Sequence, residues 1–271
     1  MQASQQLNFP VPGRVLKAVL GALFATWLVF ALAITWGGVS ESIFLQFTGN
    51  TAAILRGEVW RLFTAPILHL PTGSIGHILG TLIGLYFLGT SLESNWGPRR
   101  FGWFLLWSGV LSYTVQFAVS LLLPARIVGH LMGEYYFGAT PIIYAIAIAW
   151  ATSFRGQQVM LMFVMPVSSR ALIWITVGIS LMVLIAGGQS PSGHVANFAG
   201  MGLGYLLGGT SPSPLKRLLL RYRMGQLQRQ IDNASRIRRN KGKRAGFKVI
   251  SGGRDDDPKN QNGSRKNGTL H

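Results

Sequence analysis

The chain has 271 residues, of which 49% are hydrophobic and only 12% are charged. Soluble domains carry about 25% charged residues, so this composition argues against an ordinary soluble domain. The formal net charge is +17, but 16 of the 25 Lys and Arg residues lie between Lys216 and Lys266, so this charge describes a tail. The absence of cysteine excludes disulfides, a thiol nucleophile and cysteine-based metal sites.

Six apolar segments follow one another along the chain, at residues 16–36, 74–92, 101–123, 137–153, 171–188 and 194–209. A helix needs about 20 apolar residues to cross the core of a bilayer. The fourth and sixth segments are the shortest and carry Thr140 and His194 near their starts. Such helices can begin below the membrane surface around a wet site, where polar groups are tolerated. The sequence therefore predicts an all-α integral membrane protein with six transmembrane helices.

Lys and Arg in the short loops predict the orientation, because these residues are enriched on the cytoplasmic side. With the N-terminus inside, the inner side holds the basic tail and Arg14, Lys17, Arg99, Arg100, Arg155 and Arg170, and the outer side holds Arg56, Arg61 and Arg126. Both termini are therefore predicted to be cytoplasmic. The alternative is that the first segment, which ends near Ala31-Leu32-Ala33, is a cleaved signal peptide. That reading leaves five spans and puts the basic tail on the wrong side.

The segment between the fourth and fifth spans is too short to cross a membrane. Its apolar run, residues 159–165, is followed by Pro166, so we expect it to lie at the inner interface or to fold back. We therefore divide the chain into a cytoplasmic N-terminus at residues 1–15, a membrane domain at 16–209 and a basic cytoplasmic tail at 210–271.

The tail begins with apolar residues at helical spacing among basic ones, namely Leu215, Leu218, Leu219 and Tyr222. This pattern predicts a basic amphipathic helix on the anionic inner leaflet, so membrane lipids are expected partners. From Asn233 the tail is polar and is predicted to be disordered. No aromatic stacking platform accompanies the charge, so we expect no nucleic-acid partner.

Chemistry in this chain centres on one hydroxyl and one imidazole. A titratable group is costly at membrane depth, so His194 is a functional hypothesis, and Thr140 is its natural partner as a nucleophile. The histidines show no metal-ligand spacing, and no Gly-rich phosphate loop is present. We therefore expect no metal, no cofactor and no nucleotide. A small transporter is a weaker reading, because no acidic residue falls inside the six segments.

Several short motifs occur in a series along residues 15–209: Trp60-Arg61-Leu62-Phe63-Thr64 with Leu68-His69, Gly76-His77-Ile78-Leu79, Leu85-Tyr86-Phe87-Leu88-Gly89 with Leu92-Glu93 and Gly97, Gly138-Ala139-Thr140-Pro141 with Tyr144, and Gly193-His194. In order and spacing this series resembles the rhomboid family of intramembrane serine proteases. The resemblance implies a rhomboid-like bundle. It puts Thr140 at the position of the nucleophile and His194 at that of the base. Tyr144 then lies against the imidazole, Gly138 supports the site, and His77 and Thr81 belong to the oxyanion hole.

Three residues depart from the family's pattern. Thr140 replaces the nucleophilic serine, Pro141 replaces the following glycine, and Thr81 replaces an asparagine of the oxyanion hole. The extra methyl of threonine restricts χ1, which limits how the hydroxyl can turn between a base and a substrate. Loss of one oxyanion donor typically costs about 10² to 10³ in rate. These changes favour a rhomboid-like protein that binds transmembrane segments of clients and has weak or no proteolytic activity.

Other readings of the same residues stay open. The alternative function is an active intramembrane endopeptidase in which Thr140 attacks, His194 is the base, and His77 with the Thr140 amide steadies the oxyanion. Thr140-Pro141 could instead simply start a helix, because threonine is a good N-cap and proline suits the first turn. His77 and His194 could form hydrogen bonds that only tie helices together.

Glycines recur every four residues at Gly200, Gly204 and Gly208, and again at Gly80 and Gly84. This spacing lets helix backbones approach closely, and a general packing face is the simplest interpretation. In a rhomboid-like core the close approach brings the sixth span against the fourth. Localisation in a bacterial inner membrane is the expectation that goes with this fold.

Overall fold

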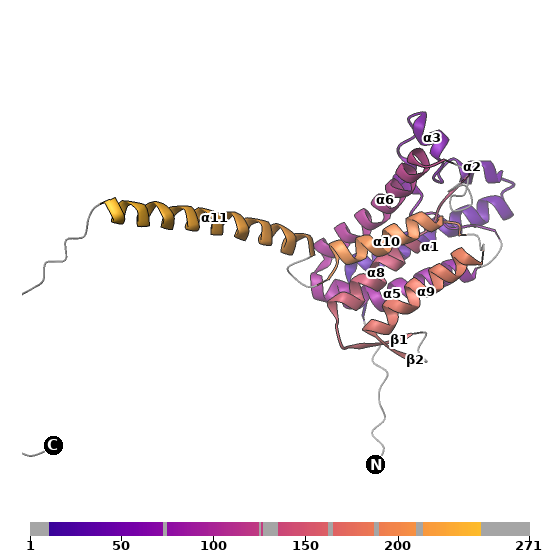
Figure 1. Ribbon diagram of the computed structural model, residues 1–271. Helices are drawn as coiled ribbons and strands as arrows, with labels where there is room; N and C mark the ends of the chain where they lie inside the picture. The colour runs from indigo at the N-terminus through magenta and orange to yellow at the C-terminus, as the bar shows by residue number, and fades with distance from the viewer. Residues whose placement is uncertain are drawn as a thin grey trace, which may run out of the picture. The chain divides into compact units, whose positions relative to one another are not determined.

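A computed structural model describes residues 11–72, 75–124, 126, 135–161, 165–186, 190–209 and 214–244. The chain is divided into two units, residues 1–219 and 220–271. The first unit is a bundle of helices in which Leu85, Phe101 and Ile146 are fully buried in the core. The longer helices of the bundle are α1 (Arg14–Thr35), α5 (Gly76–Trp96), α6 (Pro98–Leu122), α8 (Thr140–Ser153), α9 (Ser169–Ile185) and α10 (His194–Leu207) (Figure 1).

Three short helices connect α1 to α5, namely α2 (Glu41–Leu45), α3 (Thr51–Leu55) and α4 (Arg61–Thr64). Each predicted apolar segment overlaps one of the long helices, so the all-α prediction is confirmed. The helix boundaries differ from the predicted ones by up to four residues. Helix α8 begins at Thr140 and not at residue 137, because Gly138 has a positive φ of 109° that no helix accommodates. Helix α5 continues to Trp96, four residues beyond the predicted end.

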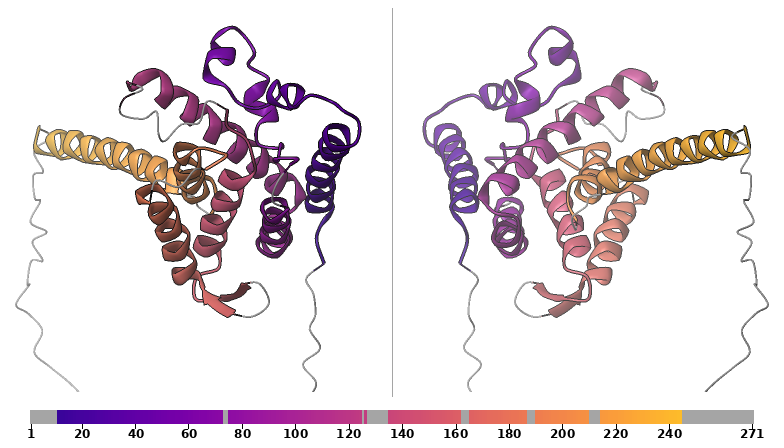
Figure 2. Two further views of the ribbon diagram at one scale, coloured as in Figure 1. Left: turned by 90° about the vertical axis from the view of Figure 1, so that its right-hand side faces the viewer. Right: turned by 90° about the vertical axis from the view of Figure 1, so that its left-hand side faces the viewer.

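The segment between α8 and α9 forms a β-hairpin, which the sequence did not predict. Strands β1 (Gln158–Leu161) and β2 (Met165–Ser168) pair antiparallel, with Gln158 opposite Ser168. The hairpin lies where α8 ends and α9 begins (Figure 2). The expected folding back of the chain therefore takes the form of a two-stranded ladder, which pairs backbone groups that a short apolar run would otherwise leave unsatisfied.

Helices α8 and α10 make the most extensive contact of any helix pair in the bundle. Added Cβ atoms at Gly200, Gly204 and Gly208 would overlap the backbone of α8 at Pro141, Ala145 and Ala149. The prediction that the sixth segment packs closely on the fourth is therefore confirmed. A Cβ at Gly80 would meet nothing, so the second glycine pair does not form such an interface.

The start of α1 is held by a buried carboxylate from α5. Glu93 is 4% exposed, and its two oxygens accept the backbone N–H groups of Val15 and Leu16, each at 3.0 Å. Carboxylates are favoured at helix N-termini, where unpaired N–H groups carry partial positive charge. Glu93 lies inside α5, which corrects the expectation that no acidic residue falls within these helices. Both of its carboxylate oxygens accept hydrogen bonds from the backbone of α1.

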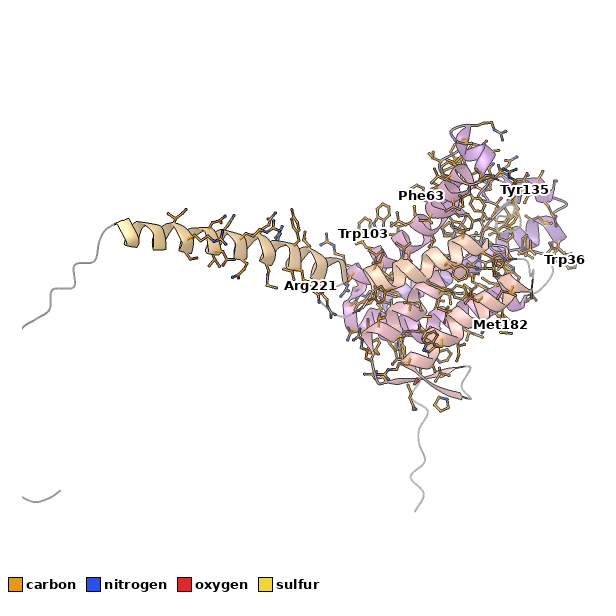
Figure 3. The ribbon with its side chains drawn as sticks, viewed as in Figure 1. Trp36, Phe63, Trp103, Tyr135, Met182 and Arg221 are labelled. Atoms are coloured by element: carbon orange, nitrogen blue, oxygen red, sulfur yellow. The ribbon has the colours of Figure 1, made fainter. Side chains whose placement is uncertain are left out.

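Large apolar side chains remain exposed over the bundle, among them the labelled Trp36, Phe63, Trp103 and Met182 (Figure 3). Among the described residues, α1 and α6 are long and apolar enough to cross a membrane, and α8 and α9 are shorter apolar helices. Exposed apolar surface of this extent fits a lipid environment and not water.

Helix α11 (Pro214–Arg244) begins at the end of the first unit and forms the described part of the second. It carries the predicted apolar residues, and Leu219, Leu220 and Tyr222 are exposed. The helix continues to Arg244, so the disorder predicted from Asn233 is wrong for residues 233–244. Residues 245–271 lie outside the described part of the chain.

Candidate functional site

A short extended segment before α8 ties three loops together. Tyr136 and Gly49 exchange two backbone hydrogen bonds of 2.8 and 2.9 Å, Gly138 N–H donates to Ala65, and Phe137 N–H donates to Pro191. The carbonyl of Gly138 accepts from the Tyr113 hydroxyl at 2.7 Å. Backbone N–H and C=O groups in a buried segment without regular secondary structure need hydrogen-bond partners, and these bonds provide them. The start of α8 is thereby fixed to the α2–α4 region, to α6 and to the loop before α10.

The hydroxyl of Thr140 lies at the first residue of α8, 3.3 Å from Nε2 of His77 near the start of α5. The N-cap is Ala139, and no side chain caps this helix, so the interpretation of Thr140 as the N-cap is wrong. Gly138, two residues earlier, has a positive φ of 109°, a backbone conformation that favours glycine. The structure therefore gives Thr140 a histidine partner, and that partner comes from α5.

A second histidine and threonine pair lies behind this contact. Nε2 of His69 is 3.3 Å from the Thr81 hydroxyl, which is also 2.9 Å from the carbonyl of His77. Both side chains are buried, with exposed fractions of 1% and 2%. The rings of His69 and His77 lie 5.3 Å apart, so the four polar residues form one cluster.

His69 is held in its neutral form. Burial lowers the pKa of His69 to about 4, repulsion from His77 adds to this shift, and a hydrogen bond to the Ile67 carbonyl opposes it. Nδ1 lies 3.2 Å from that carbonyl, so Nδ1 carries the single proton of the neutral ring. Nε2 is then an acceptor, and it competes with the His77 carbonyl for the single proton of the Thr81 hydroxyl.

His194 is the first residue of α10 and is buried. The start of this helix is supported by Gln116 of α6, whose Oε1 accepts the Ala196 N–H at 2.9 Å. A side chain at Gly193, which has a φ of 72°, would overlap the amide of Gln116. Asn197, one turn later, pairs with Ser190 and Ser192 at 3.0 and 2.8 Å. Buried polar contacts thus fix where α10 begins.

The family comparison covers this whole region. A model of the rhomboid domain matches residues 56–211, which is more than half of the chain. The chain belongs to the rhomboid family. It is similar to the RHOMBOID-like protein 12, mitochondrial, of Arabidopsis thaliana, with 33% identity over 82 residues, 30% of this chain and 23% of the relative. It is also similar to the rhomboid protease GluP of Bacillus subtilis, with 29% identity over 94 residues, 34% of this chain and 18% of the relative. The matched stretch thus spans about a fifth of each curated relative.

Some of the predicted site residues are in contact in the structure, and for others contact stays a prediction. Thr140 and His77 meet directly, Gly138 lies two residues before Thr140, and Thr81 joins them through His77 and His69. Tyr144 lies half-buried one turn after Thr140. The predicted contact between Thr140 and His194, with Tyr144 under the imidazole, stays a prediction.

Sequence reasoning missed Gln116 and the pairing of His69 with Thr81. His69 belongs to one of the motifs, but nothing in the sequence around it indicates that Thr81 is its hydrogen-bond partner. Gln116 is a lone amide inside an apolar segment, and such a residue could have been identified as the anchor of another helix.

Proposed function

We propose that this protein is a rhomboid-like polytopic membrane protein that binds transmembrane segments of client proteins and has weak or no proteolytic activity. The observation that carries this proposal is the engagement of Thr81. Its hydroxyl has one proton and lies within hydrogen-bond distance of both His69 Nε2 and the His77 carbonyl. A residue at an oxyanion position must instead aim a preorganised donor at the developing charge.

The nucleophile position adds a second reason. The Thr140 side chain is β-branched and begins a helix that continues directly with Pro141. Its stiff χ1 limits the rotation that attack on a carbonyl and proton transfer both need. The chain thus combines a hydroxyl with restricted rotation, at Thr140, with the loss of the oxyanion donor at position 81. Each of these two changes lowers the rate of acyl transfer.

Client binding is proposed for the region between α5, α8, α9 and α10. Helix α9 packs on α8 and to a smaller extent on α10, and its outer face exposes Trp174, Met182 and Ile185. Without a hydrophobic drive between helices in lipid, association depends on packing and on hydrogen bonds from polar side chains. The Thr140 and His77 pair would supply such polar contacts to a client helix.

We further propose six membrane spans, both termini in the cytoplasm, and a bacterial inner membrane as the location. The bundle supports this orientation, because Glu93 places the start of α1 beside the end of α5. Arg14, Lys17, Arg99 and Arg100 therefore gather at one end of the bundle, as the positive-inside rule requires of a cytoplasmic face. Reporter fusions after Lys17 and after Arg239 are expected to report cytoplasm. A periplasmic signal from either fusion contradicts the six-span arrangement.

The alternative function is an active endopeptidase with Thr140 as nucleophile, His194 as base, and His77 with the Thr140 amide at the oxyanion. Two observations favour it. The Thr140 hydroxyl is not used as a helix cap, and the imidazole 3.3 Å from it is that of His77, the residue that this alternative places at the oxyanion. One relative is named a rhomboid protease.

The two functions are separated by a cleavage assay on reconstituted protein with a panel of rhomboid-type transmembrane substrates. We expect intact substrates, substrate recovery by site-directed crosslinking in the region between α5, α8, α9 and α10, and no labelling by a fluorophosphonate probe. Cleavage that disappears in both Thr140→Ala and His194→Ala would make Thr140 the nucleophile and reverse the proposal.

A further inference from the structure

A cavity of about 630 Å³ lies at the end of the bundle opposite to Thr140. Its walls come from the last turns of α8, the first turn of α9 and the later part of α10. The residues that matter for its chemistry are Arg155, Arg170, Ser168, Ser169 and Tyr205. Ligand pockets commonly have volumes of about 300 to 1,000 Å³, so this cavity can hold a small polar group.

Within the described residues, neither arginine of this cavity forms a salt bridge. The sequence contains no Asp or Glu between residues 135 and 231. In the part of the chain that the structure describes, the one salt bridge joins Arg61 to Glu58, and those residues belong to the other end of the bundle. Both guanidinium groups are exposed and always charged, so they attract an anion from outside the protein.

The remaining walls combine hydroxyl groups with apolar surface. Ser168 accepts the Ala171 N–H and Ser169 accepts the Gly156 N–H, so both hydroxyls retain a proton to donate. Ile148, Ala151 and Ile173 also line the cavity. Tyr205, another lining residue, is about half exposed. An amphiphilic ligand with an anionic head and an apolar tail matches this division.

We propose that this cavity binds an anionic phospholipid, with its phosphate between Arg155 and Arg170 and its glycerol and acyl groups against Ile148 and Ile173. Arginine is suited to this role because its planar fork donates two hydrogen bonds to one phosphate. We assign this lipid to the inner leaflet, and that assignment rests on the proposed orientation of the membrane domain. The lipid chemistry itself does not depend on that orientation.

The test measures lipid binding to the detergent-purified full chain by native mass spectrometry. Dioleoyl phosphatidylglycerol, dioleoyl phosphatidylcholine and glycerol 3-phosphate are titrated separately. The variant is Arg155→Gln with Arg170→Gln. The matched control is Arg99→Gln with Arg100→Gln, which removes the same charge at the same end of the bundle but outside the cavity. The variant Arg155→Lys with Arg170→Lys retains both charges without the forked geometry.

We expect phosphatidylglycerol to bind more tightly than phosphatidylcholine, and the glutamine variant to bind it roughly 30-fold more weakly, since each basic residue near anionic lipid contributes about a factor of five. The arginine control is expected to bind as the parent chain does, and the lysine variant to fall between. Equal loss in the arginine control, or equal binding of the two lipids, overturns the proposal. Equally tight binding of glycerol 3-phosphate assigns the cavity to soluble phosphates and overturns the lipid assignment. Because binding is measured in detergent with both faces accessible, failure of the proposed orientation or of client binding leaves this readout unchanged.

Discussion

The two ends of the helix bundle differ in how their polar side chains are paired. At the end that carries Thr140, His69 and Thr81 form a buried pair, His77 and Thr140 form a partly buried pair, and His69 is kept neutral. At the other end, Arg155 and Arg170 are exposed and form no salt bridge within the described residues, and the buried carboxylate of Glu93 pairs with backbone N–H groups. Neutral pairs can be buried at low cost, whereas a charged group is buried only with hydrogen-bond partners, as Glu93 and Arg61 are, and otherwise stays where water or lipid headgroups reach it.

The largest effect is expected at the polar cluster. Thr140→Ser alone should give little cleavage, because the oxyanion donor is still missing. Thr140→Ser with Thr81→Asn should exceed the two single variants combined, by about 10² to 10³, because residues of one catalytic unit act together. Pro141 should not block this gain, since a helix's first turn needs no N–H at that position. Cleavage of a reconstituted transmembrane substrate measures the effect.

Thr152→Ser is the matched control for this series. Thr152 lies on the same helix but at the opposite end of the bundle, and its hydroxyl donates to the carbonyl of Ile148. The control should leave cleavage unchanged. A double variant no faster than Thr140→Ser would show that Thr81 does not limit the chemistry.

A substitution in the interface between α8 and α10 should have the next largest effect. Gly204→Ala forces a methyl group into the backbone of α8 at Ala145, and such overpacking costs about 3 kcal/mol. Gly202→Ala on the same helix meets nothing within 4 Å and is the control. Reversible unfolding in mixed micelles gives the free energy of unfolding of each. Equal stability of the two variants would contradict the close approach of α8 and α10.

The helices and this glycine interface were predictable because apolar length and four-residue glycine spacing are local properties of the sequence. The pairing of His69 with Thr81 was not, because it joins a loop to a helix through contacts that no periodicity encodes. The β-hairpin was missed because the short apolar run at residues 159–165 carries little sign of its partner strand. The role of Thr140 as N-cap was wrong because Ala139 already occupies that position, which only the backbone angles show.

A smaller effect is expected from pH. The pKa of His69 is lowered from 6.5 to about 4 by burial, so the unfolded chain binds a proton that the folded chain does not. The contribution of His69 to stability is therefore full above pH 6.5 and is lost as pH falls toward 4. Between pH 7 and pH 5 the loss amounts to about 2 kcal/mol. The free energy of unfolding should fall less over this interval in His69→Gln than in the parent chain, and an identical fall in both would contradict the assignment.

The smallest effect is expected at the other end, for Glu93→Gln. An amide keeps one acceptor for Val15 or Leu16 but turns an NH₂ group toward the second backbone N–H, so one hydrogen bond is lost and its donor stays buried. The loss of that bond, together with loss of the favourable charge at the helix N-terminus, should cost about 1 kcal/mol. Hydrogen exchange should accelerate at the first turn of α1 and not at the start of α10. Glu41→Gln is the control, because Glu41 is exposed at a helix start and accepts from the Thr72 hydroxyl. If Glu93→Gln instead accelerates exchange around His194 as strongly as at α1, the two ends are coupled through α5, and the separation between a neutral buried cluster and a charged end does not hold.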